Sequence, residues 1–181
     1  MFFEGQRIKA MREMIVAKTT EEREKALVKL TPFQQGDFEG IYEVMEGRPV
    51  IIRFLDPPLH EFLPTKEEDI KEIAGELNIT VADLKNVIAS LHEFNPMMGH
   101  RGCRLAVSYP EIARMQTTAV INAAIAVNKK HPEFKTEPRI MIPLVGEEKE
   151  LKFVKDVVTE TADKIIKDCL LYTSPSPRDR G

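Results

Sequence analysis

Two short apolar runs stand out in a chain whose other segments show the spacing of amphipathic helices. The first covers Pro49–Leu55 and lies between Gly47 and the turn-forming stretch that starts at Asp56. Its side chains are mostly β-branched or bulky, which is typical of a parallel strand covered on both faces. The second run covers Arg139–Val145 and has the same character. We therefore expect a strand at each run.

Apolar residues at three- and four-residue spacing predict helices before, between and after these strands. Thr19 and Glu22 have the spacing of a capping box, and Thr31-Pro32 has the form of a second helix start. Thr65 and Thr80 precede two further periodic segments. The predicted helices cover residues 7–17, 21–30, 32–47, 65–77, 80–91, 110–128 and 148–168. Strands alternating with helices predict an α/β domain with a parallel sheet.

Arg53 places a charge inside the first apolar run. Arginine is rarely buried without a partner, so this position needs an explanation. Near the carboxyl end of a strand, its planar fork can point into the space where α/β proteins bind phosphates or carboxylates. Alternatively, Arg53 forms an ion pair with a neighbour such as Asp56, or reaches the surface along its aliphatic stem. The pattern leaves both interpretations open.

The overall composition argues against several classes of function. The chain has 181 residues with 43% hydrophobic content, which is enough for one domain with a core. Its 26 basic and 29 acidic residues are interspersed, so we expect no nucleic-acid or membrane partner. No signal segment or membrane span is present, and the predicted location is cytoplasmic. Cys103 and Cys169 lack the spacing of a zinc site or a disulfide framework.

Two longer motifs point to a known family. Residues 53–64 read RFLDPPLHEFLP and residues 95–105 read NPMMGHRGCRL. Together they resemble the phosphoenolpyruvate (PEP)/pyruvate-binding barrel of the pyruvate, phosphate dikinase family of PEP-utilising enzymes. Residues 1–15 and 140–146 are similar to further segments of that barrel, in the same order. The resemblance covers residues 1–168 and implies a partial (β/α)8 barrel, truncated at both ends and with helical insertions, because a whole barrel needs ~250 residues.

The resemblance also implies a function. The family interconverts ATP, phosphate and pyruvate with AMP, diphosphate and PEP, and its barrel passes a phosphoryl group between a phosphohistidine and pyruvate. Two substrate-binding arginines of the family correspond to Arg53 and Arg101. A third would precede Met1, while the Mg²⁺ ligands and the catalytic cysteine would follow residue 168. We therefore assign no catalytic or metal-binding residue here, and expect the complete protein to be a homodimer with phosphohistidine and nucleotide-binding domains.

Other candidate residues have simpler interpretations. The four histidines, which are His60, His92, His100 and His131, lack the pairwise spacing of a metal site. Cys103 is expected to be a small buried side chain, and Arg104 to support Arg101 or to pair with an acid. Residues 103–107 fit a strand by pattern, whereas the resemblance implies a loop that leads into a helix. We follow the resemblance.

The last segment departs from the helical pattern. Residues 169–181 contain a Ser-Pro-Ser-Pro string. A DNA sequence that encodes this segment with permitted codons resembles a transposase-type sequencing adaptor. We interpret residues 169–181 as adaptor-derived or, alternatively, as a disordered tail.

Two rival functions remain open at this point. One is another PEP-utilising phosphotransferase of the PEP synthase type, and the other is a non-catalytic binding protein. The 181-residue chain alone is expected to be inactive, to bind PEP weakly or not at all, and to self-associate through uncovered strand edges.

Overall fold

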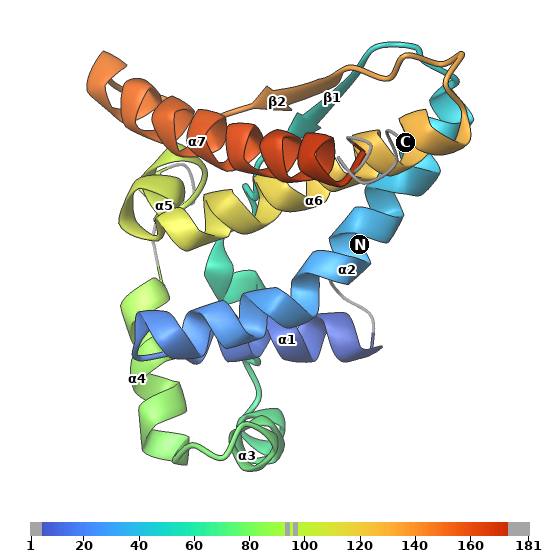
Figure 1. Cartoon of the computed structure of the whole chain (residues 1–181). Helices are drawn as coiled ribbons and strands as arrows, with labels where there is room; N and C mark the ends of the chain where they lie inside the picture. Colours follow the sequence, from blue (N-terminus) through green and yellow to red (C-terminus); the bar gives the residue numbers. More distant parts are fainter. Residues whose placement is uncertain (1–4, 93–94, 96–97, 174–181) are drawn as a thin grey trace.

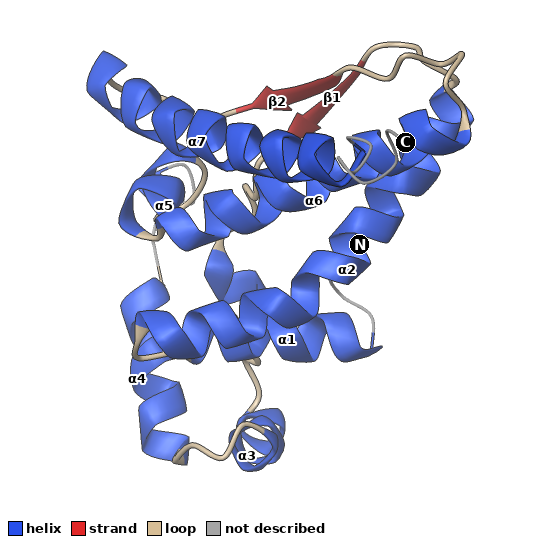
Figure 2. Ribbon diagram, viewed as in Figure 1, coloured by secondary structure: helices blue, strands red, loops and turns tan. Residues whose placement is uncertain are grey.

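The computed structural model describes residues 5–92, 95 and 98–173. It is a mostly helical α/β structure in which the described residues form two strands (Figures 1 and 2). A 3-10 turn, η1, follows the first strand. The elements in chain order are α1 (Gly5–Val16), α2 (Thr20–Met45), β1 (Val50–Arg53), η1 (Leu59–Phe62), α3 (Glu67–Glu76), α4 (Val81–Leu91), α5 (Cys103–Ser108), α6 (Pro110–Lys130), β2 (Pro138–Met141) and α7 (Glu148–Thr173).

The two strands are parallel neighbours, as the βα order predicts. Val50 lies opposite Pro138, and Arg53 lies opposite Met141. The Phe54 amide donates to the Met141 carbonyl at 3.0 Å, which continues the pairing by one bond beyond β1. The chain between the strands includes α6, which lies alongside α7 beneath the sheet, while α3 and α4 lie at the far end of the molecule (Figure 1).

Both strands are shorter than predicted, and the expectation that β1 is covered on both faces is wrong. Ile52 is buried against α2 and α6, but Ile51 points to the other face and is 58% exposed. Because side chains alternate along a strand, one face packs on the helices while the described residues leave the other open. The predicted second strand ends early, at Met141, and Leu144 further along has a positive φ of 58°, which is incompatible with an extended strand.

The predicted break at Thr31-Pro32 is also wrong, because α2 continues through Pro32. Proline lacks the amide that would bond to the carbonyl of Val28, and Val28 is 71% exposed, so this lost bond lies on the solvent side. The Thr31 hydroxyl donates to the Leu27 carbonyl at 2.8 Å, inside the helix. The helix therefore tolerates a proline that local pattern assigns to a helix start.

The other helix predictions agree with the structure to different degrees. The capping box of Thr19 and Glu22 and the cap by Thr80 are confirmed. Thr65 is not a cap, because α3 starts after Lys66 without a side-chain cap. Residues 103–107 are helical, as the resemblance implies. Helix α7 continues to Thr173, five residues beyond the predicted end, and residues 174–181 of the predicted tail lie outside the described residues.

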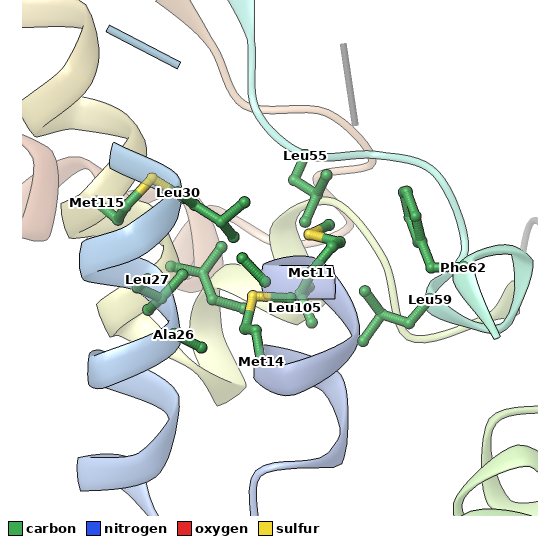
Figure 3. Close-up of a cluster of buried hydrophobic side chains, with 12 residues drawn as sticks. Met11, Met14, Ala26, Leu27, Leu30, Leu55, Leu59, Phe62, Leu105 and Met115 are labelled. Atoms are coloured by element: carbon green, nitrogen blue, oxygen red, sulfur yellow. The ribbon is translucent and has the colours of Figure 1, made fainter. Parts of the chain in front are cut away.

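The core is built around α2 and α6. One apolar cluster joins these helices to α1, α5 and the chain after β1, and Leu55 points into it beside Met11 (Figure 3). In a second cluster, Ile52 on the inner face of β1 packs against Phe38 of α2 and several residues of α6. The residue that follows Leu55, Asp56, is thus held by a chain segment anchored in the core.

A buried ion pair also joins α2 to α6. Arg23 Nη1 lies 2.6 Å from Glu111 Oε1, and both residues are less than a tenth exposed. The guanidinium carbon of Arg23 also lies 4.0 Å from the ring centre of Tyr109. No helix in the described part of the chain is both long enough and apolar enough to cross a membrane.

Tyr42 on α2 gives a prediction about alkaline stability. Its hydroxyl is buried without a hydrogen-bond partner among the described residues, and burial raises its pKa to about 12. An unfolded tyrosine ionises near pH 10, so ionisation of this group does not change the free energy of unfolding below pH 10. It lowers that free energy as the pH rises from 10 to 12, where the unfolded state loses the proton that the folded state keeps. Tyr42→Phe is expected to raise the free energy of unfolding by about 1 kcal/mol at pH 7, by removing an unsatisfied hydroxyl. Urea unfolding at pH 7, 10 and 11 should show that the advantage of the variant grows with pH, and a constant difference would contradict this account.

Candidate functional site

Arg53 and Arg101 converge on one carboxylate. Arg53 Nη2 lies 2.8 Å from Asp56 Oδ2, and Arg101 Nη2 lies 3.0 Å from the same oxygen. Arg101 Nε also donates to Asp56 Oδ1 at 3.1 Å. Two guanidinium groups that are 48 positions apart in the sequence therefore share one carboxylate at the carboxyl end of β1.

The segment after β1 holds Asp56 in place. Arg53 is the last residue of the strand, and the chain then turns at Pro57 and Pro58. The amide of Leu55 donates to Gln116 Oε1 on α6 at 2.7 Å, and the Gln116 side chain is buried. Asp56 itself is 8% exposed, because the core-anchored Leu55 precedes it. A rigid carboxylate is thus available to orient both arginines.

Arg101 comes from the loop between α4 and α5, and several contacts hold that loop. His100 Nε2 lies 2.8 Å from the hydroxyl of Ser108, and Arg104 donates to the Gly99 carbonyl at 3.1 Å. The amide of Cys103 donates to the Pro143 carbonyl at 2.8 Å, which ties the loop to the chain that follows β2. The loop therefore presents Arg101 from a fixed direction.

Both arginines line a cleft of about 630 Å³. Its walls are mostly apolar side chains of β1 and α2, together with the prolines after Asp56. Arg53 stays open to solvent, with 56% of its side chain exposed, while Arg101 is more enclosed at 19%. The lining residues are Phe38, Ile41, Ile51, Ile52, Arg53, Phe54, Leu55, Asp56, Pro57, Pro58, Glu61, Arg101 and Gln116.

This arrangement suits the binding of a small anion. Asp56 offsets one of the two positive charges that contact it, and Glu61 also lines the cleft, so anion binding would depend on the hydrogen-bond donors of the two guanidinium groups and not on a net positive charge. A guanidinium can donate two parallel hydrogen bonds to phosphate or carboxylate oxygens. Two such forks beside an apolar wall can hold the charged end of a ligand while the wall contacts its carbon atoms.

The structure combines the two interpretations that the sequence left open for Arg53. The side chain pairs with Asp56, and it also remains exposed to the cleft that Arg101 enters. The sequence interpretation named Asp56 as a possible partner of Arg53, but it did not count Asp56 among the site residues or predict its contact with Arg101. Gln116 lies 61 positions from Leu55, so no local pattern could indicate its contact with that amide.

The remaining candidates are not gathered into a site. His60 and His92 face each other with ring centres 6.3 Å apart, and His131 stacks on Phe134. Cys103 is fully buried, and burial raises the pKa of its thiol, as expected for a small packing residue. The described residues contain no group of three or more His, Cys, Asp or Glu side chains that could hold a metal ion. The described residues by themselves therefore do not provide a magnesium site.

Comparison with known proteins shows extensive similarity. Residues 1–176 match the family described as PEP-utilising enzyme, PEP-binding domain. The chain is 58% identical over 168 residues to pyruvate, phosphate dikinase of Clostridium symbiosum, which covers 93% of this chain and 19% of that protein. It is 51% identical over 166 residues to the Rhizobium meliloti dikinase, covering 92% and 18%. It is 46% identical over 171 residues to the chloroplastic dikinase 1 of Oryza sativa subsp. japonica, covering 93% and 18%. The chain spans about a fifth of the length of these relatives.

Proposed function

The chain belongs to the PEP-utilising enzyme family, and from this membership we propose that its cleft binds PEP and pyruvate as part of a pyruvate, phosphate dikinase. The observation that carries the proposal is the convergence of Arg53 and Arg101 on Asp56 beside an apolar wall. The relatives described above are all named dikinases, which favours this activity over that of a PEP synthase.

In the proposed reaction, the phosphoryl group leaves the ring nitrogen of a phosphohistidine and bonds to the enolate oxygen of pyruvate. The pyruvate methyl group gives its proton to the family's catalytic cysteine, which would follow residue 168. The N–P bond breaks as the O–P bond forms. Such a transfer depends mainly on positioning and charge stabilisation. Arg53 and Arg101 bind oxygens of the transferred group, and Asp56 keeps both guanidinium groups oriented. Magnesium, when bound, would neutralise developing charge, and its ligands would come from outside the described residues.

The proposal extends to the surrounding structure. The parallel pair β1 and β2 would be adjacent strands of a (β/α)8 barrel that other segments complete. The exposed side chains of Ile51 and Met141 support this, because an open apolar strand face requires cover. We propose residues 1–168 as the functional unit, with residues 169–181 outside it. We further propose a cytoplasmic homodimer for the complete protein.

A chimera tests the function. The segment of this chain that matches the Clostridium symbiosum dikinase would replace the corresponding segment of that enzyme. The chimera should exchange label between pyruvate and PEP, and should also retain exchange between ATP and AMP through its nucleotide-binding half. A folded chimera that keeps the nucleotide exchange but has no exchange between pyruvate and PEP would overturn the proposal.

A further inference from the structure

Gly102, the residue next to Arg101, has a backbone conformation that L-residues rarely adopt. Its φ is 58° and its ψ is −129°. With a positive φ and a strongly negative ψ, it lies outside the small left-handed helical region that Asn and Asp tolerate. Glycine reaches this conformation without steric cost, because it has no Cβ. The backbone at this point therefore depends on glycine.

The space around Gly102 also requires a glycine at this position. A Cβ atom at this position would lie 2.9 Å from the carbonyl oxygen of Pro143 and 3.3 Å from the Pro143 Cγ atom. It would also lie 3.4 Å from Asp56 Oδ1, the oxygen that accepts the Arg101 Nε hydrogen bond. The next residue, Cys103, donates its amide to that same Pro143 carbonyl at 2.8 Å. An added Cβ would therefore clash with the Pro143 carbonyl oxygen, whereas its distance to Asp56 is that of an ordinary van der Waals contact.

We propose that Gly102 is a positioning residue for the anion site, because its missing side chain lets the loop lie against the Pro143 carbonyl, the placement from which Arg101 shares the Asp56 carboxylate with Arg53. The shared carboxylate sets the relative placement of the two guanidinium groups. An added methyl group would push the loop away from the Pro143 carbonyl and carry Arg101 with it. The role in PEP binding rests on the proposed function, whereas the geometric role does not.

Two other glycines provide matched controls. Gly47 also has a positive φ, and a Cβ there would lie 2.1 Å from the Phe134 carbonyl oxygen, but it precedes the amino end of β1, opposite the end that carries Arg53. Gly47→Ala therefore adds backbone strain away from the anion site. Gly36 lies inside α2 with open space around an added Cβ, so Gly36→Ala adds a methyl group without strain.

The test measures kcat/KM for PEP in the chimeric dikinase. Gly102→Ala is expected to lower it about 100-fold, the size of effect that a displacement near 1 Å can cause. Gly47→Ala should lower the melting temperature but leave kcat/KM of the folded enzyme within about twofold. Gly36→Ala should also leave kcat/KM within about twofold, and should raise the melting temperature slightly, because alanine is the better helix former. If Gly102 acts through Arg101, its effect should disappear in an Arg101→Leu background. A loss that persists there, or no loss from Gly102→Ala alone, would overturn the proposal.

Two further measurements cover the remaining outcomes. If Gly102→Ala does not fold, Pro143→Gly loosens the opposing wall without adding an atom, and should lower kcat/KM about tenfold in a way that also disappears with Arg101→Leu. If the unsubstituted chimera is inactive with PEP, the proposed function fails separately. Crystal structures of the chimera and its variants then decide the geometric role. Gly102→Ala, or Pro143→Gly if Gly102→Ala does not fold, should break the contact between Arg101 and Asp56, and an intact contact would refute the role.

Discussion

Replacing Arg53 or Arg101 by Leu in the chimeric dikinase is expected to lower the rate of exchange between pyruvate and PEP by about 10²–10³-fold, the usual cost of removing one preorganised charge-stabilising donor. Each substitution removes a guanidinium that reaches Asp56 within about 3 Å in the structure. Exchange between ATP and AMP should continue, because it does not use this cleft. The measurement is the two exchange rates on the same preparation.

Arg48→Leu is the matched control for this experiment. Arg48 lies just before β1, is largely exposed, and forms a long ion pair with Glu46 at 3.9 Å, so its loss should leave both exchange rates within about twofold. Arg53→Lys should give an intermediate loss, since it keeps the charge but not the fork. Equal loss of both exchanges in Arg53→Leu would indicate misfolding, and an unchanged pyruvate exchange would exclude Arg53 from the phosphoryl site.

Glu111→Leu is expected to destabilise the fold by about 3–5 kcal/mol, because it leaves the charge of Arg23 buried without its counter-charge. Arg23 has a second acceptor, the Ala17 carbonyl at 3.4 Å, but that contact is long and carries no charge. The ion pair also joins α2 to α6, the two helices around which the core is built. Urea unfolding of the 181-residue chain, followed by circular dichroism, measures the loss.

Two variants complete the Glu111 experiment. Arg23→Met combined with Glu111→Leu should recover most of the lost stability, since an apolar pair of similar volume can replace a buried ion pair. Glu67→Leu breaks the exposed pair between Glu67 and Lys85 and should cost less than about 1 kcal/mol. A loss below about 1 kcal/mol for Glu111→Leu would show that water reaches Arg23 more easily than the structure indicates.

Local sequence patterns predicted features that depend on neighbouring residues. The capping box of Thr19 and Glu22 and the cap at Thr80 are present, because each needs only a side chain and an amide three residues away. The same local logic failed at Pro32, where packing of α2 against α6 outweighs a single missing hydrogen bond. It also predicted that both faces of β1 are buried, because an apolar run does not show how many faces of a strand will pack against other elements.

For the candidate site, the sequence by itself determined the chemistry: a charged Arg53 at the end of a strand, and a second arginine, Arg101, in a motif similar to that of a known family. Only the tertiary structure decided the arrangement. Asp56 contacts both arginines, and Gln116 accepts a hydrogen bond from the amide of Leu55, 61 positions away in the sequence. Gly102 lets the loop lie against Pro143. Each of these contacts depends on the distance between segments that lie far apart in the sequence, and no spacing along the chain encodes such a distance.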